Sequence, residues 1–285
     1  MFRFPWFHYR TMIIITYFYV QMKILCFIPL LLILCIHSAN AQQEKRLALV
    51  IGNSNYKHYS KLKNPINDAQ LISATLKKLN FETIEAFNTG TRKELMDVIR
   101  VFGKKRKQYD VAFVYYAGHA IQIDNINYLM PTDELINTEE IWDAIEMQLV
   151  SVQSVAKWLE NESKDKINVL ILDACRSNPI PDGSRAIGTS GGGLSKENNT
   201  EGTLIAFAAA AGKTASDGHK NNKNSPYATS LAKHMLSENI SIYQVFKNVR
   251  ADIESMNLIP RQSPEFTDKT TGADFYLNYN PNNKI

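Results

Sequence analysis

From Arg46 onward, short apolar segments alternate with stretches that carry apolar residues at helical spacing. Most of the apolar segments are too continuously apolar to have a face that meets solvent. This order of elements predicts an α/β fold, with a mostly parallel sheet and helices on both faces. The segments are rich in β-branched and aromatic residues and predict five strands: Leu47–Ile51, Phe81–Ile84, Val111–Tyr116, Ile167–Leu172 and Thr203–Phe207.

Helical patterns lie between and after these strands. Ser225 and Pro226 supply an N-cap and a first-turn proline for a helix that ends near Met235. Ser241 caps one more helix, and the apolar residues at 275–277 predict a final edge strand. Three amphipathic segments predict the crossover helices, at residues 67–79, 92–102 and 151–159.

One long irregular stretch, Arg176–Gly202, directly follows the fourth predicted strand. It holds Pro179, Pro181 and Gly191–Gly193. Long loops at strand ends usually shape a binding site. Because the sequence has no internal repeat, low-complexity tract or linker, we expect a single domain over residues 46–280.

Residues 22–41 are expected to be a signal peptide. They contain a basic start at Lys23, an apolar run over residues 24–36 and, at residues 39–41, the small-x-small sequence that signal peptidases cut. Residues 1–21 are then interpreted as an upstream start-codon artefact. An uncleaved anchor is the alternative, but neither apolar half reaches the roughly 20 residues that span a bilayer. We therefore expect an exported chain, periplasmic or extracellular, with no stable membrane insertion after signal removal.

Charge gives no reason to expect a nucleic acid or an anionic membrane as partner. The chain has a net charge of +4, with 32 basic and 28 acidic residues. Three of the basic residues, Arg3, Arg10 and Lys23, lie in the first 41 positions, which hold no acidic residue. The 29 basic residues that remain nearly balance the 28 acidic ones, so the basic excess of polyanion-binding proteins is missing.

Cysteine usage singles out Cys175. Cys26 and Cys35 fall in the predicted signal peptide, which leaves one thiol and no internal disulfide in an oxidising compartment. A buried cysteine that acts as a small apolar residue is the alternative. An exported domain that keeps one unpaired thiol accepts a risk of oxidation, which favours a use for that thiol.

A histidine and this cysteine follow two predicted strands. His119 comes after the third strand, and Cys175 comes after the fourth, in Leu172-Asp-Ala-Cys175. In open α/β sheets ligands bind at the carboxyl ends of the strands, and adjacent strands lie about 5 Å apart. We therefore expect His119 to lie close enough to take the thiol proton, as the general base of a cysteine nucleophile does.

Four motifs carry a resemblance to a known family: Leu47-Ala-Leu-Val-Ile-Gly-Asn53, Asn67-Asp-Ala69, Tyr115-Tyr-Ala-Gly-His119 and Asp173-Ala-Cys-Arg176. Their order and spacing resemble those of the bacterial caspase-like peptidases, which are related to metacaspases. The histidine of caspases stands about 50 residues before the cysteine, and here the separation is 56 residues. The resemblance runs from about Arg46 to Leu277, and residues 202–227 resemble the smaller caspase subunit.

The resemblance implies a caspase-like three-layer fold with six main strands, and hydrolysis of peptide bonds through a thioester on the enzyme, without a cofactor. It implies that Cys175 attacks the carbonyl carbon, and that His119 deprotonates the thiol and later protonates the leaving amine. The backbone N–H groups of Ala120 and Cys175 would hold the oxyanion. Many relatives have glycine after the histidine, so the backbone here must accommodate the Cβ of Ala120.

The resemblance also implies a specificity for basic residues. Animal caspases bind Asp of the substrate and carry Gln two residues before the nucleophile, where this chain has Asp173. In metacaspases, that acidic position and the Asp of the Asn-Asp-Ala motif, here Asp68, line a pocket for Arg or Lys. The alternatives are a helix-dipole partner for Asp68 and a strand-end hydrogen-bond acceptor for Asp173. Because both carboxylates stand where the pocket needs them, we predict protein or peptide substrates that are cut after Arg or Lys.

Other apparent motifs fail on spacing. The run Ala211-Gly-Lys-Thr214 lacks the first glycine of a phosphate-binding loop, which would fall at Phe207, so an NTPase is excluded. Asp182, Glu197 and Glu201 are too far apart for a calcium cluster, and no metal site is expected.

Two alternative functions stay open. One is a non-catalytic caspase-like interaction module, and the other is a different thiol chemistry, such as acyl transfer or small-molecule hydrolysis.

Overall fold

The computed structural model describes residues 44–123, 126–136, 147–159, 166–175, 202–209, 222–258, 261–270 and 274–283. The predicted signal peptide, the residues before it and residues 176–201 of the long loop lie outside these ranges. Within the described part, every helix is too short or too polar to pass through a lipid bilayer.

The described elements follow the predicted order up to residue 255, with two additional short strands. They are β1 (Arg46–Gly52), α2 (Pro65–Lys78), β2 (Phe81–Phe87), α3 (Arg92–Arg106), β3 (Val111–Ile123), β4 (Ile126–Leu129), β5 (Val150–Ser151), α5 (Val152–Leu159), β6 (Ile167–Cys175), β7 (Thr203–Phe207), α6 (Pro226–Met235), α7 (Ile242–Ser255) and β8 (Glu265–Asp268).

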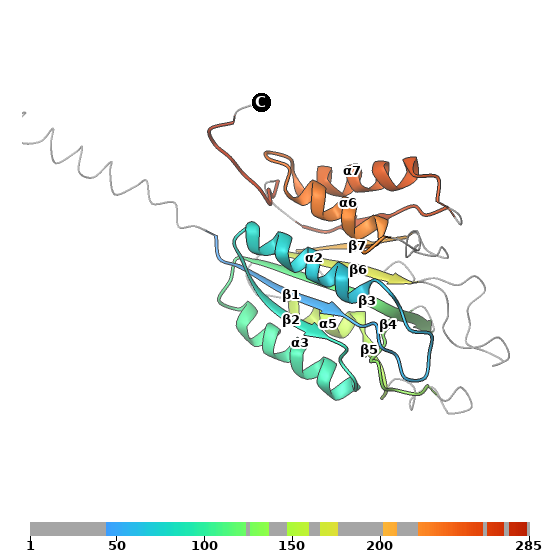
Figure 1. Cartoon of the computed structure of the whole chain (residues 1–285). Coiled ribbons are helices and arrows are strands. Elements are labelled where there is room, and N and C mark those ends of the chain that lie inside the picture. The colour runs from blue at the N-terminus through green and yellow to red at the C-terminus, as the bar shows by residue number, and fades with distance from the viewer. Residues whose placement is uncertain are drawn as a thin grey trace, which may run out of the picture. The chain divides into compact units, whose positions relative to one another are not determined.

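Six strands form the main sheet, in the order β2-β1-β3-β6-β7-β8. Figure 1 labels β2, β1, β3, β6 and β7 of this sheet. Neighbouring strands run parallel, except that β7 and β8 pair antiparallel. Beyond its pairing with β1 and β6, β3 continues into a small antiparallel extension with β4 and β5. The predicted fold class, a mostly parallel sheet of six main strands with helices on both faces, is confirmed.

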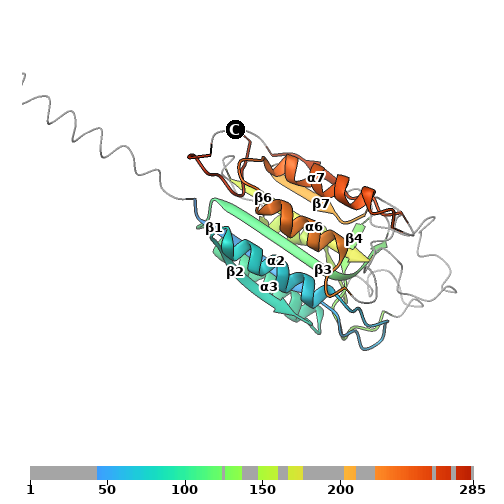
Figure 2. The ribbon, with the colours of Figure 1, turned by 45° about the horizontal axis from the view of Figure 1, so that its top comes forward.

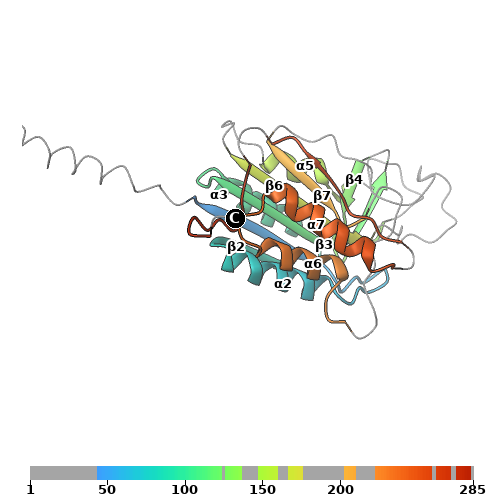
Figure 3. The same ribbon diagram turned by 90° about the horizontal axis from the view of Figure 1, so that it is seen from above.

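Two layers of helices cover the sheet. α2, α6 and α7 lie side by side on one face, and α3 and α5 lie on the other (Figure 2; Figure 3). Successive residues of β3 contribute to two hydrophobic cores, one on each face of the sheet. Phe113 and Tyr115 pack with the first group of helices, and Val114 and Tyr116 pack with the second. Both faces of the sheet are therefore dry, as the continuously apolar strands predict.

Polar side chains set the first residues of the helices. Thr91 accepts a hydrogen bond from the N–H of Glu94, and the Glu94 carboxylate accepts one from the N–H of Thr91, so α3 starts with a capping box. Ser225 and Ser241 accept hydrogen bonds from the first turns of α6 and α7, and both predicted caps are confirmed. These bonds satisfy N–H groups that have no partner within the helix.

The outer edge strand differs from the prediction. The apolar pattern predicts this strand at residues 275–277, whereas the strand that pairs with β7 is β8, and Tyr276 makes an isolated bridge to Ser241. The two apolar residues of the 275–277 segment are buried, but they belong to the core beneath α2, α6 and α7. An apolar pattern of this kind reports burial and does not distinguish a strand ladder from packing against helices.

β3 is longer than predicted. Its predicted end was Tyr116, but the strand continues to Ile123, so His119 lies within it and not after it. The pairing partner changes at this point: residues 111–119 pair with β6, and residues 120–123 pair with β4. Because this stretch mixes glycine, histidine and glutamine with apolar residues, an apolar run does not reveal the continuation.

Gly103 lets α3 pack closely on α5. A Cβ at this position would lie 2.5 Å from Cε3 of Trp158 and 3.0 Å from its Cβ. We predict that Gly103→Ala lowers the free energy of unfolding by about 1–3 kcal/mol, the usual cost of overpacking, although glycine-to-alanine changes in helices normally stabilise by up to about 1 kcal/mol. Urea unfolding measures the change.

The control is the same substitution in a Trp158→Leu background, where most of the loss should be recovered because the collision is gone. A Gly103→Ala protein as stable as the parent would contradict the close packing.

Candidate active site

β3 and β6 bring His119 and Cys175 together. The two strands pair in parallel, and the last pair of their register sets His119 opposite Cys175. Residues paired in this way lie about 5 Å apart, and Cys175 is the last residue of β6. The structure thus places both residues on neighbouring strands at the carboxyl edge of the main sheet.

The imidazole of His119 is buried and held from two sides. The backbone N–H of His119 donates to the hydroxyl of Tyr56 (2.7 Å), and the Tyr56 ring lies against the imidazole, with 4.4 Å between the ring centroids. Nε2 lies 2.9 Å from the carbonyl oxygen of Ser60. Sequence reasoning missed Tyr56 and Ser60, because both lie in a loop that has no motif of its own.

The contact with Ser60 assigns the tautomer of His119. A carbonyl oxygen only accepts hydrogen bonds, so Nε2 must carry the proton. In the neutral ring Nδ1 is then the basic nitrogen, the atom that can receive a proton. When the ring becomes an imidazolium, the same carbonyl remains a favourable partner for the Nε2–H group. The contact with Ser60 thus leaves Nδ1 as the nitrogen of the neutral ring that can accept a proton.

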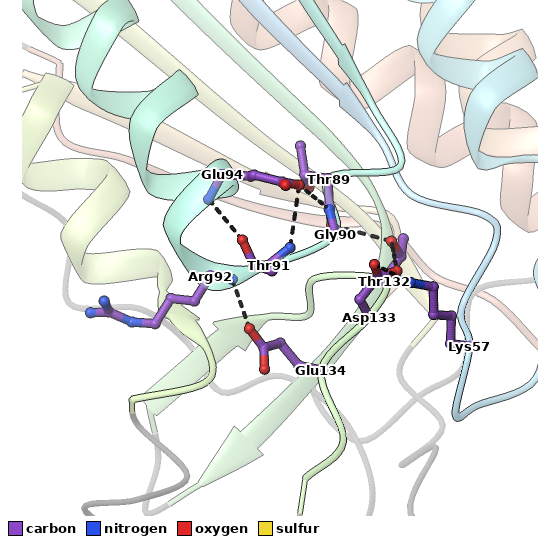
Figure 4. Close-up of polar contacts among 9 residues, drawn as sticks. All are labelled: Lys57, Thr89, Gly90, Thr91, Arg92, Glu94, Thr132, Asp133 and Glu134. Atoms are coloured by element: carbon purple, nitrogen blue, oxygen red, sulfur yellow. Dashed lines mark hydrogen bonds and ion pairs between the residues drawn. The ribbon is translucent and has the colours of Figure 1, made fainter.

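The loop between β1 and α2, Asn53–Asn64, carries both groups that hold His119. It rests on the segment that follows β4, residues 130–136. The N–H of Lys57 donates to the carbonyl of Thr132 (2.9 Å), and the Lys57 ammonium pairs with the carboxylate of Asp133 (Figure 4). Exposed ion pairs stabilise little, so the backbone hydrogen bond contributes more to the position of the loop.

The 130–136 segment also contacts the start of α3. The N–H of Asp133 donates to the carbonyl of Gly90 (2.8 Å), and the N–H of Arg92 donates to the carboxylate of Glu134 (3.1 Å) (Figure 4). The first N–H groups of a helix have no partner within it, and Glu134 satisfies one of them. The β1–α2 loop, the segment after β4 and the start of α3 are therefore one connected hydrogen-bonded unit.

Gly118 is needed for the close approach of two tyrosine hydroxyls. A Cβ on Gly118, whose φ is +156°, would lie 2.7 Å from the hydroxyl oxygen of Tyr56 and 2.8 Å from that of Tyr116. These hydroxyls bond the backbone N–H and the carbonyl of His119, respectively. The glycine of the Tyr-Tyr-Ala-Gly-His motif thus leaves room for the groups that fix the histidine backbone.

Ala120, the predicted oxyanion residue, has ordinary strand backbone. It pairs with Leu129 of β4, and the N–H of Met130 donates to the carbonyl of His119 (3.1 Å). Because hydrogen bonds alternate along an antiparallel pair, the N–H of Ala120 points away from β4 and toward the side of β6, the strand that ends at Cys175. Ala120 is buried and packs in the core beneath α3 and α5, so its Cβ is accommodated.

Two buried carboxylates meet at the same end of the sheet. Asp68 lies in the first turn of α2 and is 3% exposed, and Asp173 lies near the end of β6 and is 9% exposed. Ser225 joins them, since its N–H donates to Asp68 (2.9 Å) and its hydroxyl donates to Asp173 (3.3 Å). The side-chain amide of Asn224 also donates to Asp68 (2.9 Å), and the hydroxyl of Tyr115 donates to Asp173 (2.6 Å). The structure thus brings the two predicted pocket residues together.

Ser225 has a second role that sequence reasoning missed. Its hydroxyl accepts a hydrogen bond from the N–H of Ala228 (3.0 Å) as the cap of α6, while it donates to Asp173. A hydroxyl donates one bond and accepts others, so both contacts form at once. The Ser-Pro pair signals a helix start in any sequence, and it carries no sign of a distant carboxylate.

Within the described ranges, neutral groups of Tyr115, Asn224 and Ser225 donate hydrogen bonds to the carboxylate pair. Burial, and then the charges of Asp173 and Asp68, raise the pKa of Tyr115 well above its usual value. The phenol therefore stays protonated and remains a donor to Asp173. Hydrogen bonds from neutral groups stabilise carboxylates without cancelling their charge.

The described residues include no group of three or more His, Cys, Asp or Glu side chains that could hold a metal ion. Several residues weighed for other chemistries lie outside the described ranges: Asp182, Glu197, Glu201, Gly191–Gly193 and Ala211–Thr214.

A mostly parallel sheet with a histidine and a cysteine at the same level of two adjacent strands defines an α/β protein of the caspase type. The chain belongs to the Caspase domain family, which matches residues 45–276. This match confirms the family that the four sequence motifs resemble.

Two mammalian proteins are similar to part of the chain. The human mucosa-associated lymphoid tissue lymphoma translocation protein 1 is 27% identical over 135 residues, which are 47% of this chain and 15% of the human protein. Its mouse homolog is 26% identical over 135 residues and is covered to the same extent. The chain therefore spans only a small part of these relatives.

Tyr56→Phe is predicted to destabilise the fold at the histidine. The phenylalanine ring can still lie against the imidazole, but the buried N–H of His119 loses its acceptor. The free energy of unfolding should fall by about 1–3 kcal/mol, the cost of an unsatisfied buried donor. Urea unfolding measures the loss. Tyr279→Phe, at a tyrosine that is 66% exposed, is the matched control, and equal effects of the two changes would contradict the role of Tyr56.

Proposed function

We propose that the chain is a cysteine-type endopeptidase that hydrolyses peptide bonds after Arg or Lys, with Cys175 as nucleophile and His119 as general base. The observation that carries the proposal is the register of β3 and β6, which sets the two residues opposite each other. Membership of the Caspase domain family supports peptidase chemistry. The buried pair of Asp68 and Asp173 supports the basic specificity.

In the proposed reaction, Nδ1 of His119 takes the proton of the Cys175 thiol, and the thiolate attacks the carbonyl carbon of the peptide bond. The imidazolium keeps its Nε2–H bond to the carbonyl of Ser60, which stabilises the charged ring. It then gives its proton to the leaving amine as the C–N bond breaks, and a thioester remains on Cys175. Water, deprotonated by His119, attacks the thioester, and the second product leaves with the thiol restored.

Negative charge develops on the carbonyl oxygen during both attacks. The proposed donors to this oxyanion are the backbone N–H groups of Ala120 and Cys175. The orientation of the Ala120 N–H toward the side of β6 supports this assignment. Such donors are already in place before the reaction, so they stabilise the charged intermediate without reorganisation.

The proposed specificity follows from charge. A guanidinium or ammonium group that binds between Asp68 and Asp173 forms charge-assisted hydrogen bonds, which are about twice as strong as neutral ones. An acidic substrate side chain would bring a third negative charge next to two others and would be disfavoured. The proposed substrates are therefore proteins or peptides with Arg or Lys on the acyl side of the cleaved bond.

We also propose that the enzyme acts on exported or extracellular proteins. The signal-peptide pattern of residues 22–41 supports this location. Amino-terminal sequencing of the chain exported by a bacterial host tests it, because cleavage after Ala41 leaves Gln42 as the first residue.

Cys175→Ala and His119→Ala are each predicted to abolish cleavage of reporter peptides that end in Arg. Each change removes a group that the other needs, so the double variant should be no less active than either single variant. Activity is compared on peptides that end in Arg, Lys, Asp or Ala, with unfolding curves as the control for folding. Turnover by a folded Cys175→Ala protein would rule out the proposed mechanism.

Asp173→Asn and Asp68→Asn are predicted to impair cleavage of basic peptides selectively. Each loses one charge-assisted contact, about 1.5–3 kcal/mol, so kcat/KM on Arg and Lys peptides should fall about tenfold to a hundredfold. Neutral peptides should be affected far less, since the amide still accepts the hydrogen bonds of its neighbours.

Asp97→Asn is the matched control, because this carboxylate is exposed on α3 and pairs with Lys93 and Arg100. Asp68→Asn guards against indirect effects on Cys175, since Asp68 lies on a different element. Equal losses on basic and neutral peptides in both pocket variants, or a parent that prefers Asp, would disprove the basic specificity.

A further inference from the structure

Tyr227 is a buried tyrosine to which the proposed mechanism gives no role. It lies in the first turn of α6, two residues after Ser225, and is 1% exposed. Among the residues that the structure describes, its hydroxyl has no hydrogen-bond partner. The Tyr227 hydroxyl can both donate and accept a hydrogen bond. Within the described part of the chain it is buried and does neither.

Tyr227 lies close enough to Asp173 to be affected by its charge. Ser225 donates to Asp173, which places the start of α6 against the end of β6. Burial, followed by the charge of Asp173, raises the pKa of Tyr227 well above its usual value. Tyr227 in turn contributes to the raised pKa of Tyr115, whose hydroxyl is bonded to Asp173. The two phenols and the Asp173 carboxylate therefore influence one another electrostatically, and Tyr115 and Asp173 are also hydrogen-bonded.

The two tyrosines contribute differently to the free protein. The hydroxyl of Tyr115 donates to Asp173 at 2.6 Å, so the protein loses a hydrogen bond if this hydroxyl is removed. A buried hydroxyl without a partner gives up its bonds to water and gains none, which costs stability. Phenylalanine at position 227 would fill the same apolar surroundings without this cost. An unsatisfied buried group in a native structure calls for an explanation.

We propose that the Tyr227 hydroxyl is a specificity-determining group of the acidic pocket, and that its hydrogen-bond partner is the basic side chain of the substrate. When a guanidinium or ammonium group binds between Asp68 and Asp173, one of its N–H groups donates to Tyr227. The inference rests on the proposed basic specificity and adds a neutral acceptor to two charged ones. An ammonium has three N–H donors and a guanidinium has five, enough for two carboxylates and one hydroxyl.

Peptide binding tests the inference. The parent is the Cys175→Ala protein, which binds without cutting, and the probes are a blocked peptide with Arg on the acyl side and its neutral citrulline analogue. In isothermal titration calorimetry, Tyr227→Phe should weaken binding of the Arg peptide by about tenfold, the loss of one hydrogen bond to a charged group. Binding of the citrulline peptide should change little. Tyr279→Phe, at an exposed tyrosine, is the matched control.

Stability against urea provides a second test, because a purely structural role of the Tyr227 hydroxyl would give a different result. The midpoint of urea unfolding should be equal or higher after Tyr227→Phe, because the free protein loses no hydrogen bond. It should be lower after Tyr115→Phe, which removes a donor to Asp173. A Tyr227→Phe protein that is less stable than the parent, or that does not fold, would overturn the inference, since the hydroxyl would then already be bonded.

The outcomes separate this inference from the proposed function. If the parent does not prefer the Arg peptide to the citrulline peptide, the proposed basic specificity of the pocket is wrong, and so is the inference that depends on it. If the parent prefers Arg and Tyr227→Phe either keeps full affinity or loses affinity for both peptides equally, the inference alone is wrong. If the wild-type chain binds the Arg peptide through Tyr227 but cleaves no peptide, the inference is supported and the proposed peptidase activity is refuted.

Discussion

The parallel pairing of β3 with β6 is the interaction on which the rest of the site depends. Its register sets His119 opposite Cys175, and the same two strands carry Tyr115 and Asp173, which are joined by a hydrogen bond. A slip of one residue would turn every side chain of one strand to the other face of the sheet. His119, Cys175 and the carboxylate near the end of β6 therefore share one constraint, and none of them can be repositioned without the others.

Two successive tyrosines of β3 lie on opposite faces of the sheet and donate hydrogen bonds to different groups of the site. Tyr115 packs beneath α2, α6 and α7 and donates to Asp173, whereas Tyr116 packs beneath α3 and α5 and donates to the carbonyl of His119 (2.6 Å). Both phenols are buried, and both use their hydroxyl within the protein. One segment of β3 thus supports the carboxylate pair with one residue and the histidine backbone with the next.

Local patterns were sufficient to predict the buried strands, the helix caps and the neighbouring positions of His119 and Cys175, because parallel strands end at one edge of a sheet. Ser60 and Tyr56 were not predictable, since a loop carbonyl and a single tyrosine acquire their roles only when the loop folds against β3. The bond from Ser225 to a carboxylate 52 residues away likewise leaves no local signal. The edge strand was misplaced because apolar residues pack against helices as readily as they pair in a ladder.

The carboxylate pair is assembled from distant parts of the chain. Asp68 comes from the start of α2 and Asp173 from the end of β6, and the serine that bridges them follows Asp173 by 52 residues. The residues of β3 and β6 that pair with each other all lie at or before Cys175. Chains emerge from the ribosome with the N-terminal part first. During synthesis the strands that carry the histidine and the cysteine are therefore complete before the serine that joins the two carboxylates exists, so the bridged carboxylate pair is assembled later than either of those strands.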